Sequence, residues 1–175
     1  MEHGLTFLRT QVSAVAAHHQ TFLRSLADHE AEGDDPRFVN LCARYLPIMR
    51  DHQHMLDEYA RELGADESLG QRVLSTVSGL VRDLADVVRE TDYQRLVHDI
   101  ILARQLEDAF KTFREVGRSI GMTKLSQIGE MAERHHDDYG RDANRLVQQM
   151  FIEQVKGSSG DAHRESMQVA DRPIR

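Results

Sequence analysis

Apolar residues recur every three or four positions along most of this chain, which is the periodicity of amphipathic α-helices. Alternating runs rich in β-branched residues, which would indicate strands, do not occur in the sequence. The pattern predicts five helices, at about residues 2–30, 36–63, 67–90, 92–120 and 122–155. We therefore expect an all-α fold.

Short breaks separate the expected helices. Pro36 suits the first position of a helix, and Thr91 suits an N-cap. Gly64 and Gly121 suit the position just after a helix. The four long helices are expected to form two antiparallel hairpins, with the helix at 67–90 as an extra helix between them. This is the layout of a ferritin-like four-helix bundle, and a plain up-and-down bundle is the alternative.

The apolar face of the helix expected at 92–120 changes direction near Leu102. Leu96 and Ile100 lie on one side of this helix. The apolar residues on the other side are Leu106, Ala109, Phe113, Val116 and Ile120. A kink, or a change of packing partner near the middle of the helix, is therefore expected.

The character of the chain changes at Gly157. The sequence Gly157-Ser158-Ser159-Gly160 opens a polar segment that has few apolar residues up to Arg175. A segment of this composition buries too little apolar surface to fold by itself. The sequence therefore predicts a helical bundle at 1–156 and a disordered C-terminal tail at 157–175.

Histidines occupy positions where two of the helices should be apolar. At about 100° per residue, His19 points in the same direction as Val12 and Leu26. His52 points in the same direction as Tyr45 in the next helix. A buried ionisable group is unfavourable unless it is paired or bound to a metal ion. These two histidines are therefore candidates for a site inside the bundle.

The second hairpin carries further candidates. Glu107 aligns with one apolar face of the helix at 92–120. His135 and His136 straddle the apolar centre of the last helix, and Glu133-x-x-His136 has the spacing of di-metal sites in helical bundles. Glu107 and His136 are about equally far from the turn at Gly121, so we expect them at one level of the bundle.

The candidate metal ligands are His19, His52, Glu107, Glu133 and His136. Imidazole and carboxylate ligands suit iron, manganese or zinc, and the expected ion is iron or manganese. The pair Asp51-x-x-His54 is an alternative in the second helix, although the helical angles turn His54 toward solvent. A buried hydrogen-bond network without a metal ion is the competing interpretation, and both stay open here.

Charge and composition restrict the function classes. The chain has 22 Lys and Arg residues against 29 Asp and Glu residues, a net charge of -7, which disfavours a general nucleic-acid binder. No apolar run approaches the ~20 residues of a transmembrane helix. Cys42 is the single cysteine, so an internal disulfide is excluded and a cytoplasmic location is the expectation. No phosphate-binding loop or nucleophile motif assigns an enzyme activity.

Three segments carry a resemblance to a known family. They are His52 to Gly64 (HQHMLDEYARELG), Gln105 to Phe110 (QLEDAF) and Glu130 to His136 (EMAERHH). Through them, residues 5–150 resemble the ferritin-like superfamily, and most closely its YciF-type stress-associated proteins. The resemblance implies a ferritin-like bundle with a site for metal ions in its core.

The di-iron members of that superfamily carry a Glu on the first helix and Glu-x-x-His on the second. Here the first position matches His18, His19 or Gln20, and the second matches Asp51-x-x-His54 or His52 alone. Glu107 and the Glu133-x-x-His136 pair keep the residue types of the family. The departures suggest a mononuclear or altered site, or a bundle that has lost its metal ion.

Two functions compete at this point. The first is a metal-binding ferritin-like protein with a role in stress response or metal handling. The second is a non-catalytic interaction or structural protein that has lost the metal site. A homodimer is expected, since symmetric dimers are the commonest oligomers. A hemerythrin-like site is a third, weaker interpretation, supported by His54-x-x-x-Glu58 alone.

Overall fold

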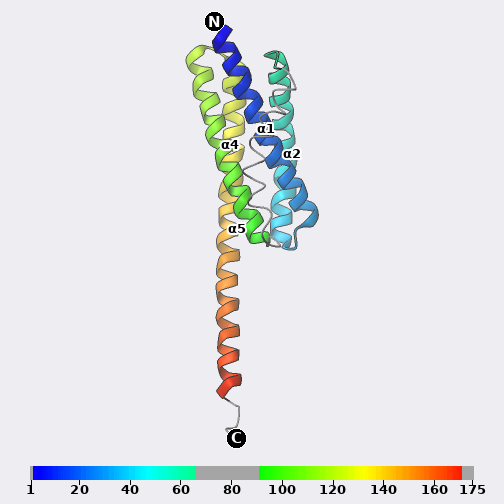
Figure 1. The fold of residues 1–175 in the computed structure, drawn as a ribbon, viewed down its shortest axis with the longest axis vertical. Coiled ribbons are helices and arrows are strands. Elements are labelled where there is room, and N and C mark those ends of the chain that lie inside the picture. The colour runs from blue at the N-terminus through cyan, green and yellow to red at the C-terminus, as the bar shows by residue number, and fades with distance from the viewer. Residues whose placement is uncertain (1, 66–90, 171–175) are drawn as a thin grey trace.

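The computed structural model describes residues 2–65 and 91–170, with side chains described for residues 3–65 and 91–157. The described residues form four helices and no strand. The helices are α1 (Glu2–Glu32), α2 (Pro36–Glu62), α4 (Asp92–Ile120) and α5 (Thr123–Ala170) (Figure 1). The all-α prediction is confirmed. The helix predicted at 67–90 lies outside the described residues.

The helices begin and end at the capping residues that the sequence contains. Asp35 caps α2 by accepting a hydrogen bond from the backbone amide of Arg37 (2.8 Å), and Pro36 occupies the first helical position. Thr91 and Gln94 form a capping box at the start of α4. Gly121 ends α4 with a φ of 75°, a left-handed conformation that glycine adopts without strain.

Each helix packs against two others, so the four form a closed ring around one core. α1 contacts α2 and α4, and α5 contacts α2 and α4. At one end of the bundle the Arg9 side chain of α1 donates a hydrogen bond to the carbonyl oxygen of Leu63, just after α2. α4 begins at the opposite end, beside the loop between α1 and α2 (Figure 1). All four neighbouring pairs are therefore antiparallel, and the end of α2 lies far from the start of α4.

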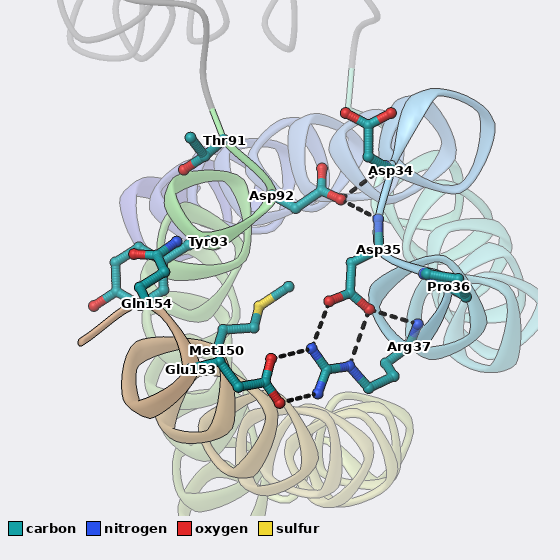
Figure 2. Close-up of a pocket in the computed structure, with 10 residues that line it drawn as sticks. All are labelled: Asp34, Asp35, Pro36, Arg37, Thr91, Asp92, Tyr93, Met150, Glu153 and Gln154. Carbon is teal, nitrogen blue, oxygen red and sulfur yellow. Dashed lines mark hydrogen bonds and ion pairs between the residues drawn. The ribbon is translucent and has the colours of Figure 1, made fainter. Parts of the chain in front are cut away.

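Polar contacts fasten the end of the bundle where α4 begins. A carboxylate oxygen of Asp92 accepts hydrogen bonds from the backbone amides of Asp34 (2.7 Å) and Asp35 (2.5 Å). Arg37 donates to the carboxylates of both Asp35 and Glu153 in the same region (Figure 2). These contacts link the α1–α2 loop to α4 and α5.

The buried face of α4 corrects one prediction. A single continuous stripe is buried, made of Leu96, Asp99, Leu102, Ala103, Leu106, Phe110, Phe113 and Gly117. Val116 and Ile120, which the sequence assigned to a second face, are exposed. The predicted change in direction of the apolar face of α4 was wrong. Asp99 and Gly117 belong to the buried stripe, but neither has an apolar side chain, so the apolar pattern did not include them.

Gly117 is buried because α4 and α5 approach each other closely there. A Cβ atom at Gly117 would lie 2.5 Å from the backbone nitrogen of Ser126. The same applies to Gly129 of α5, where a Cβ would lie 2.4 Å from the backbone nitrogen of Arg114. The two glycines therefore set the spacing of the second hairpin, a role that apolar periodicity does not reveal.

α5 extends beyond the other three helices (Figure 1). Met150 is the last buried residue among those whose side chains are described, and residues 151–157 are exposed. The backbone continues as a helix to Ala170, which differs from the irregular conformation predicted from Gly157 onward. The helical backbone is compatible with the good helix formers after Gly160, such as Glu165. A helical backbone does not measure the stability of a projecting segment, so disorder at 157–175 and the boundary at 156 stay predictions.

Candidate metal centre

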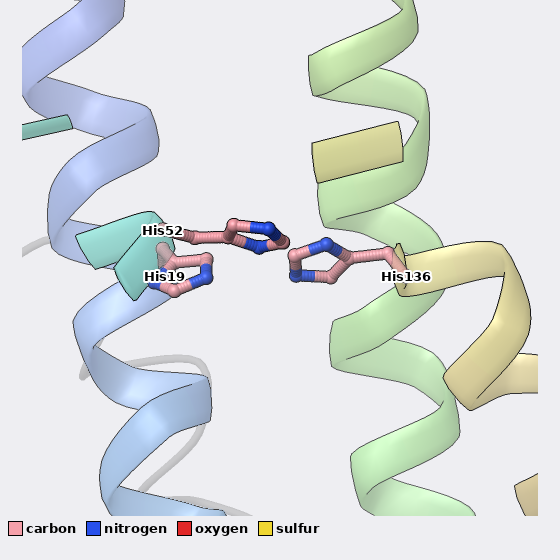
Figure 3. A group of neighbouring side chains, drawn as sticks. All are labelled: His19, His52 and His136. Atoms are coloured by element: carbon pink, nitrogen blue, oxygen red, sulfur yellow. The ribbon is translucent and has the colours of Figure 1, made fainter. Parts of the chain in front are cut away.

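Three histidines from three different helices meet in the core of the bundle. They are His19 of α1, His52 of α2 and His136 of α5 (Figure 3). One ring nitrogen of each lies within 4.8 Å of one ring nitrogen of each of the other two. All three residues are at most 2% exposed. The histidines therefore form a compact buried group, called the histidine triad below.

The register of the helices brings the triad together. His19 lies across the first hairpin from Gln53, with which it forms a hydrogen bond, so His52 is at the same depth. His136 reaches this level from α5, and its ring centroid lies 5.3 Å from that of His19 and 5.6 Å from that of His52. Each residue lies near the middle of the packed part of its helix, where burial is most complete.

Each imidazole uses one ring nitrogen in a hydrogen bond. Nδ1 of His19 lies 2.9 Å from Oε1 of Gln53, and Nδ1 of His136 lies 2.8 Å from the carbonyl oxygen of Ala132. Both partners are acceptors, so both Nδ1 atoms carry the proton. Nε2 of His52 lies 2.9 Å from Nδ1 of His135, and the two rings are stacked. These bonds orient the rings, as hydrogen-bonded partners of metal ligands do.

The other nitrogen of each ring is buried and has no hydrogen-bond partner. These atoms are Nε2 of His19, Nδ1 of His52 and Nε2 of His136. A neutral imidazole with a protonated Nδ1 presents a lone pair at Nε2, so His19 and His136 each keep an unused hydrogen-bond acceptor, which is also a metal-binding atom, buried in the core. Buried polar atoms without partners are rare in folded proteins and indicate a missing partner.

Burial keeps the triad neutral at physiological pH. Desolvation lowers the pKa of His19 to about 4, despite its hydrogen bond to Gln53. Desolvation, together with the neighbouring His19 and His135, lowers the pKa of His52 to about 3. Burial also lowers the pKa of His136 well below its ordinary value. Neutral imidazole is the form that binds metal ions, so the three histidines need not release a proton before they bind one.

Phenylalanine rings surround the triad. The Phe110 ring of α4 lies within 6.5 Å of all three imidazoles, measured between ring centroids, and closest to His136 at 5.0 Å. Phe22 of α1 packs against His19 at 6.5 Å and His136 at 5.7 Å. Both phenylalanines are 0% exposed. Phe110 of α4 and Phe22 of α1 together are called the phenylalanine wall below.

The two glutamates predicted as ligands do not join this group. The carboxylate of Glu107 on α4 is paired with Arg104, and that of Glu133 on α5 is paired with Arg114. Both glutamate side chains are partly exposed, at 21% and 18%. Glu107 is at the expected level, three residues before Phe110, but its carboxylate is engaged by an arginine. The predicted set of five ligands thus reduces to three neighbouring imidazoles in this geometry.

The remaining histidine candidates lie at the edge of the site or outside it. His135 is half-buried and contacts His52. His54 and Asp51 are exposed, as the helical angles predict for His54. His18 is half-buried, and its Nε2 atom has no partner. Of the alternatives in α2, the structure therefore places His52 in the core.

Sequence reasoning missed two residues that support this region. Gln53 accepts the hydrogen bond that orients His19, and Asp99 forms a second buried polar cluster with Ser25 and His29. Asp99 occupies the buried stripe of α4, three residues after Leu96, so its spacing was the available signal. Gln53 gave no such signal, because its role depends on the hairpin register.

Comparisons with protein-family models, with curated proteins and with solved structures give no match for this chain. Among the residues that the structure describes, no helix combines the length and apolar character required to span a bilayer. The function therefore has to be inferred from the geometry of the side chains.

Proposed function

We propose that this protein binds one transition-metal ion in the core of a ferritin-like helical bundle, through His19, His52 and His136, with a role in metal handling or stress response. The observation that carries the proposal is the set of three buried imidazole nitrogens without hydrogen-bond partners. A metal ion held between the three rings would supply the partner that these buried nitrogens lack.

The geometry is suited to a metal ion after a small adjustment. Three atoms within 4.8 Å of one another lie at most about 2.8 Å from a common centre. Bonds between zinc and imidazole nitrogen are about 2.0–2.1 Å long. Small rotations of the three side chains would supply the difference. The hydrogen bonds to Gln53, His135 and Ala132 on the opposite ring nitrogens support the same conclusion.

The chemical type of the ligand atoms indicates which ion the site binds. The sequence-based expectation of iron or manganese counted Glu107 and Glu133 as ligands, whereas both carboxylates are paired with arginines. Three imidazoles without a carboxylate suit zinc, copper or iron better than manganese, which prefers oxygen ligands. Iron therefore remains a candidate on this donor set, and manganese is disfavoured.

The arrangement of the helices supports the ferritin-like part of the proposal. α2 ends at one end of the bundle and α4 begins at the other, so the two hairpins are joined by one long connection (Figure 1). Ferritin-like folds have one long crossover, whereas a plain up-and-down bundle has short loops throughout. The bundle layout thus favours the first of the two alternatives.

The experiment is metal analysis of tag-free protein after reconstitution with Fe(II), Mn(II), Zn(II) and copper ions. We expect one ion per chain in the wild type and none in His136→Ala. His54→Ala is the matched control, since it removes an exposed histidine of α2 and should retain the ion. Absence of a bound ion from the wild type under all conditions would reject the proposal.

Exposed apolar side chains support a second function, self-association. Phe151, Ile152 and Val155 follow the buried Met150 on α5 and are 49–54% exposed. Exposed apolar patches mark sites of protein association. We propose that α5 contributes to a homodimer. Sedimentation of the wild type and of an Ile152→Glu variant tests this, and a wild type that stays monomeric at high concentration would contradict it.

A further inference from the structure

We propose that the histidine triad is selective for monovalent copper, Cu(I), held by three imidazole nitrogens and shielded from water. This inference rests on the proposed metal site and specifies its ligand. Three features carry it: the neutral donor set, the phenylalanine wall and the pairing of the nearby carboxylates with arginines.

The first feature is charge. His19, His52 and His136 form the group of neighbouring donors within the described residues, and the group contains no carboxylate. A divalent ion bound by three neutral imidazoles keeps its full charge inside a core where the ligands are at most 2% exposed. The desolvation penalty of a buried ion grows with the square of its charge, so a monovalent ion pays about a quarter of it. The uncompensated site therefore favours Cu(I) over Zn(II) or Fe(II).

The second feature is that arginines bind the two glutamates of α4 and α5 that the sequence predicted as ligands. Glu133 lies one helical turn before His136, but Arg114 of α4 binds its carboxylate. Glu107 lies one turn before Phe110, and Arg104 binds its carboxylate. Each negative charge is thus matched by an arginine and gives little neutralisation to an ion in the triad. A divalent ion would have to break these pairs to gain a carboxylate ligand.

The third feature is coordination number. Phe110 packs against all three imidazoles, and Phe22 packs against two of them, His19 and His136. Zinc in proteins takes four ligands, the fourth often a water molecule. Cu(I) forms stable three-coordinate complexes and needs no water. An apolar shell limits solvent access to a metal ion, so the phenylalanine wall favours the ion with the lower coordination number.

The test compares the dissociation constants of Cu(I) and Zn(II) for the full-length, tag-free chain. Both are measured by competition with chromophoric chelators, Cu(I) under anaerobic conditions with ascorbate, and X-ray absorption counts the copper ligands. We expect one Cu(I) per chain, coordinated by three nitrogens and held at least about tenfold more tightly than Zn(II), because the ion of lower charge loses less hydration energy on burial. The Cys42→Ala variant should bind Cu(I) equally well, because the thiol is not a ligand.

Phe110→Ala tests the role of the wall. It should open space for water and reduce the preference for Cu(I) over Zn(II) about tenfold. Phe113→Ala is the matched control, since it removes another buried ring of α4 that packs against Phe110. The control should leave the preference within about threefold of the wild type. Phe110→Leu, a milder change, replaces Phe110→Ala if circular dichroism shows that the alanine variant does not fold.

The outcomes separate this inference from the proposed function. Binding of Zn(II) as tightly as Cu(I), a four-coordinate copper spectrum or loss of Cu(I) in Cys42→Ala would overturn the Cu(I) assignment. A metal site could still exist in the first two cases. Failure of the wild type to bind Cu(I), Zn(II) or Fe(II) would reject both the assignment and the metal site.

Discussion

The carboxylate of Asp99 on α4 lies 2.8 Å from Nδ1 of His29 on α1, in a second buried polar cluster away from the histidine triad. Ser25 donates to the other carboxylate oxygen at 2.6 Å. Asp99 is 0% exposed, and this pairing compensates for its burial. The contact ties the first hairpin to the second and fixes the level at which α1 and α4 meet.

Asp99→Ala should therefore destabilise the protein without affecting the metal site. We expect the free energy of unfolding to fall by about 3 kcal/mol, since one partner of a buried pair is removed and His29 loses its acceptor. Urea denaturation followed by circular dichroism measures this change. Asp108→Ala, an exposed position on the same helix, is the control and should shift the free energy by less than about 0.5 kcal/mol. An equal effect of both substitutions would contradict the role of Asp99.

The stability of the metal-free protein should decrease as the pH falls below neutrality. The pKa of His19 in the folded state is about 4, below its ordinary value of 6.5, so the unfolded chain takes up a proton that the folded chain does not. The free energy of unfolding therefore falls between about pH 6.5 and 4, by up to about 1.4 kcal/mol per pH unit for each such histidine. The lowered pKa values of His52 and His136 act in the same direction.

Denaturation curves of the wild type and of His136→Leu, recorded with a chelator between pH 7 and 5, measure this dependence. The variant lacks one of the three buried imidazoles, so its unfolding takes up one proton fewer at low pH. The free energy of unfolding of the variant should therefore change less steeply with pH. Other titrating groups are common to both proteins and cancel in the comparison. Identical slopes would show that His136 takes up a proton in the folded state as readily as in the unfolded chain.

Gln53 should affect metal affinity although it is not a ligand. Its Oε1 atom accepts the hydrogen bond from Nδ1 of His19 and so holds the lone pair of Nε2 toward the core. Gln53→Leu should weaken metal binding about 10–100-fold, the range found for partners of metal ligands. Competition with a chromophoric chelator measures the affinity. Gln53 also donates from Nε2 to Asp57 (2.8 Å), so Gln53→Glu is combined with Asp57→Asn. This pair keeps an acceptor for His19 and a hydrogen bond to residue 57, and it should recover most of the loss, which a purely structural role would not predict.

The close approach of α4 and α5 gives a prediction about stability. Gly117→Ala would place a Cβ atom 2.5 Å from the backbone of Ser126, which the helices can relieve only by moving apart. We expect a loss of about 2 kcal/mol in the free energy of unfolding. Gly157→Ala is the matched change in open space on α5 and should be neutral or stabilising by up to about 1 kcal/mol. A neutral Gly117→Ala would contradict the close packing.

Helix positions were predictable because they depend on local signals. Pro36, Thr91 and Gly121 act on the backbone within a few residues, and the structure confirms the boundaries that they indicate. The central histidines were predictable for a similar reason. His19 and His52 share the direction of apolar neighbours on their own helices, so their burial follows from helical periodicity.

The pairing of a charged residue was less predictable where its partner lies in another helix. Glu107 pairs with Arg104, three residues earlier on the same helix, and this spacing is visible in the sequence. Glu133 is paired with Arg114 across the second hairpin, and this contact follows from the register between α4 and α5. No spacing within a single helix carries that information.

The sequence by itself determined that the chain forms long amphipathic helices, where those capped by Pro36, Thr91 and Gly121 begin or end, and that His19 and His52 face inward, because these properties depend on residues within about one or two turns. The tertiary structure alone decided that three imidazoles meet, that the nearby carboxylates pair with arginines and that Phe110 covers the site. Apart from the Arg104–Glu107 pair within α4, these relationships join atoms that are distant along the chain, and packing of whole helices sets their distances.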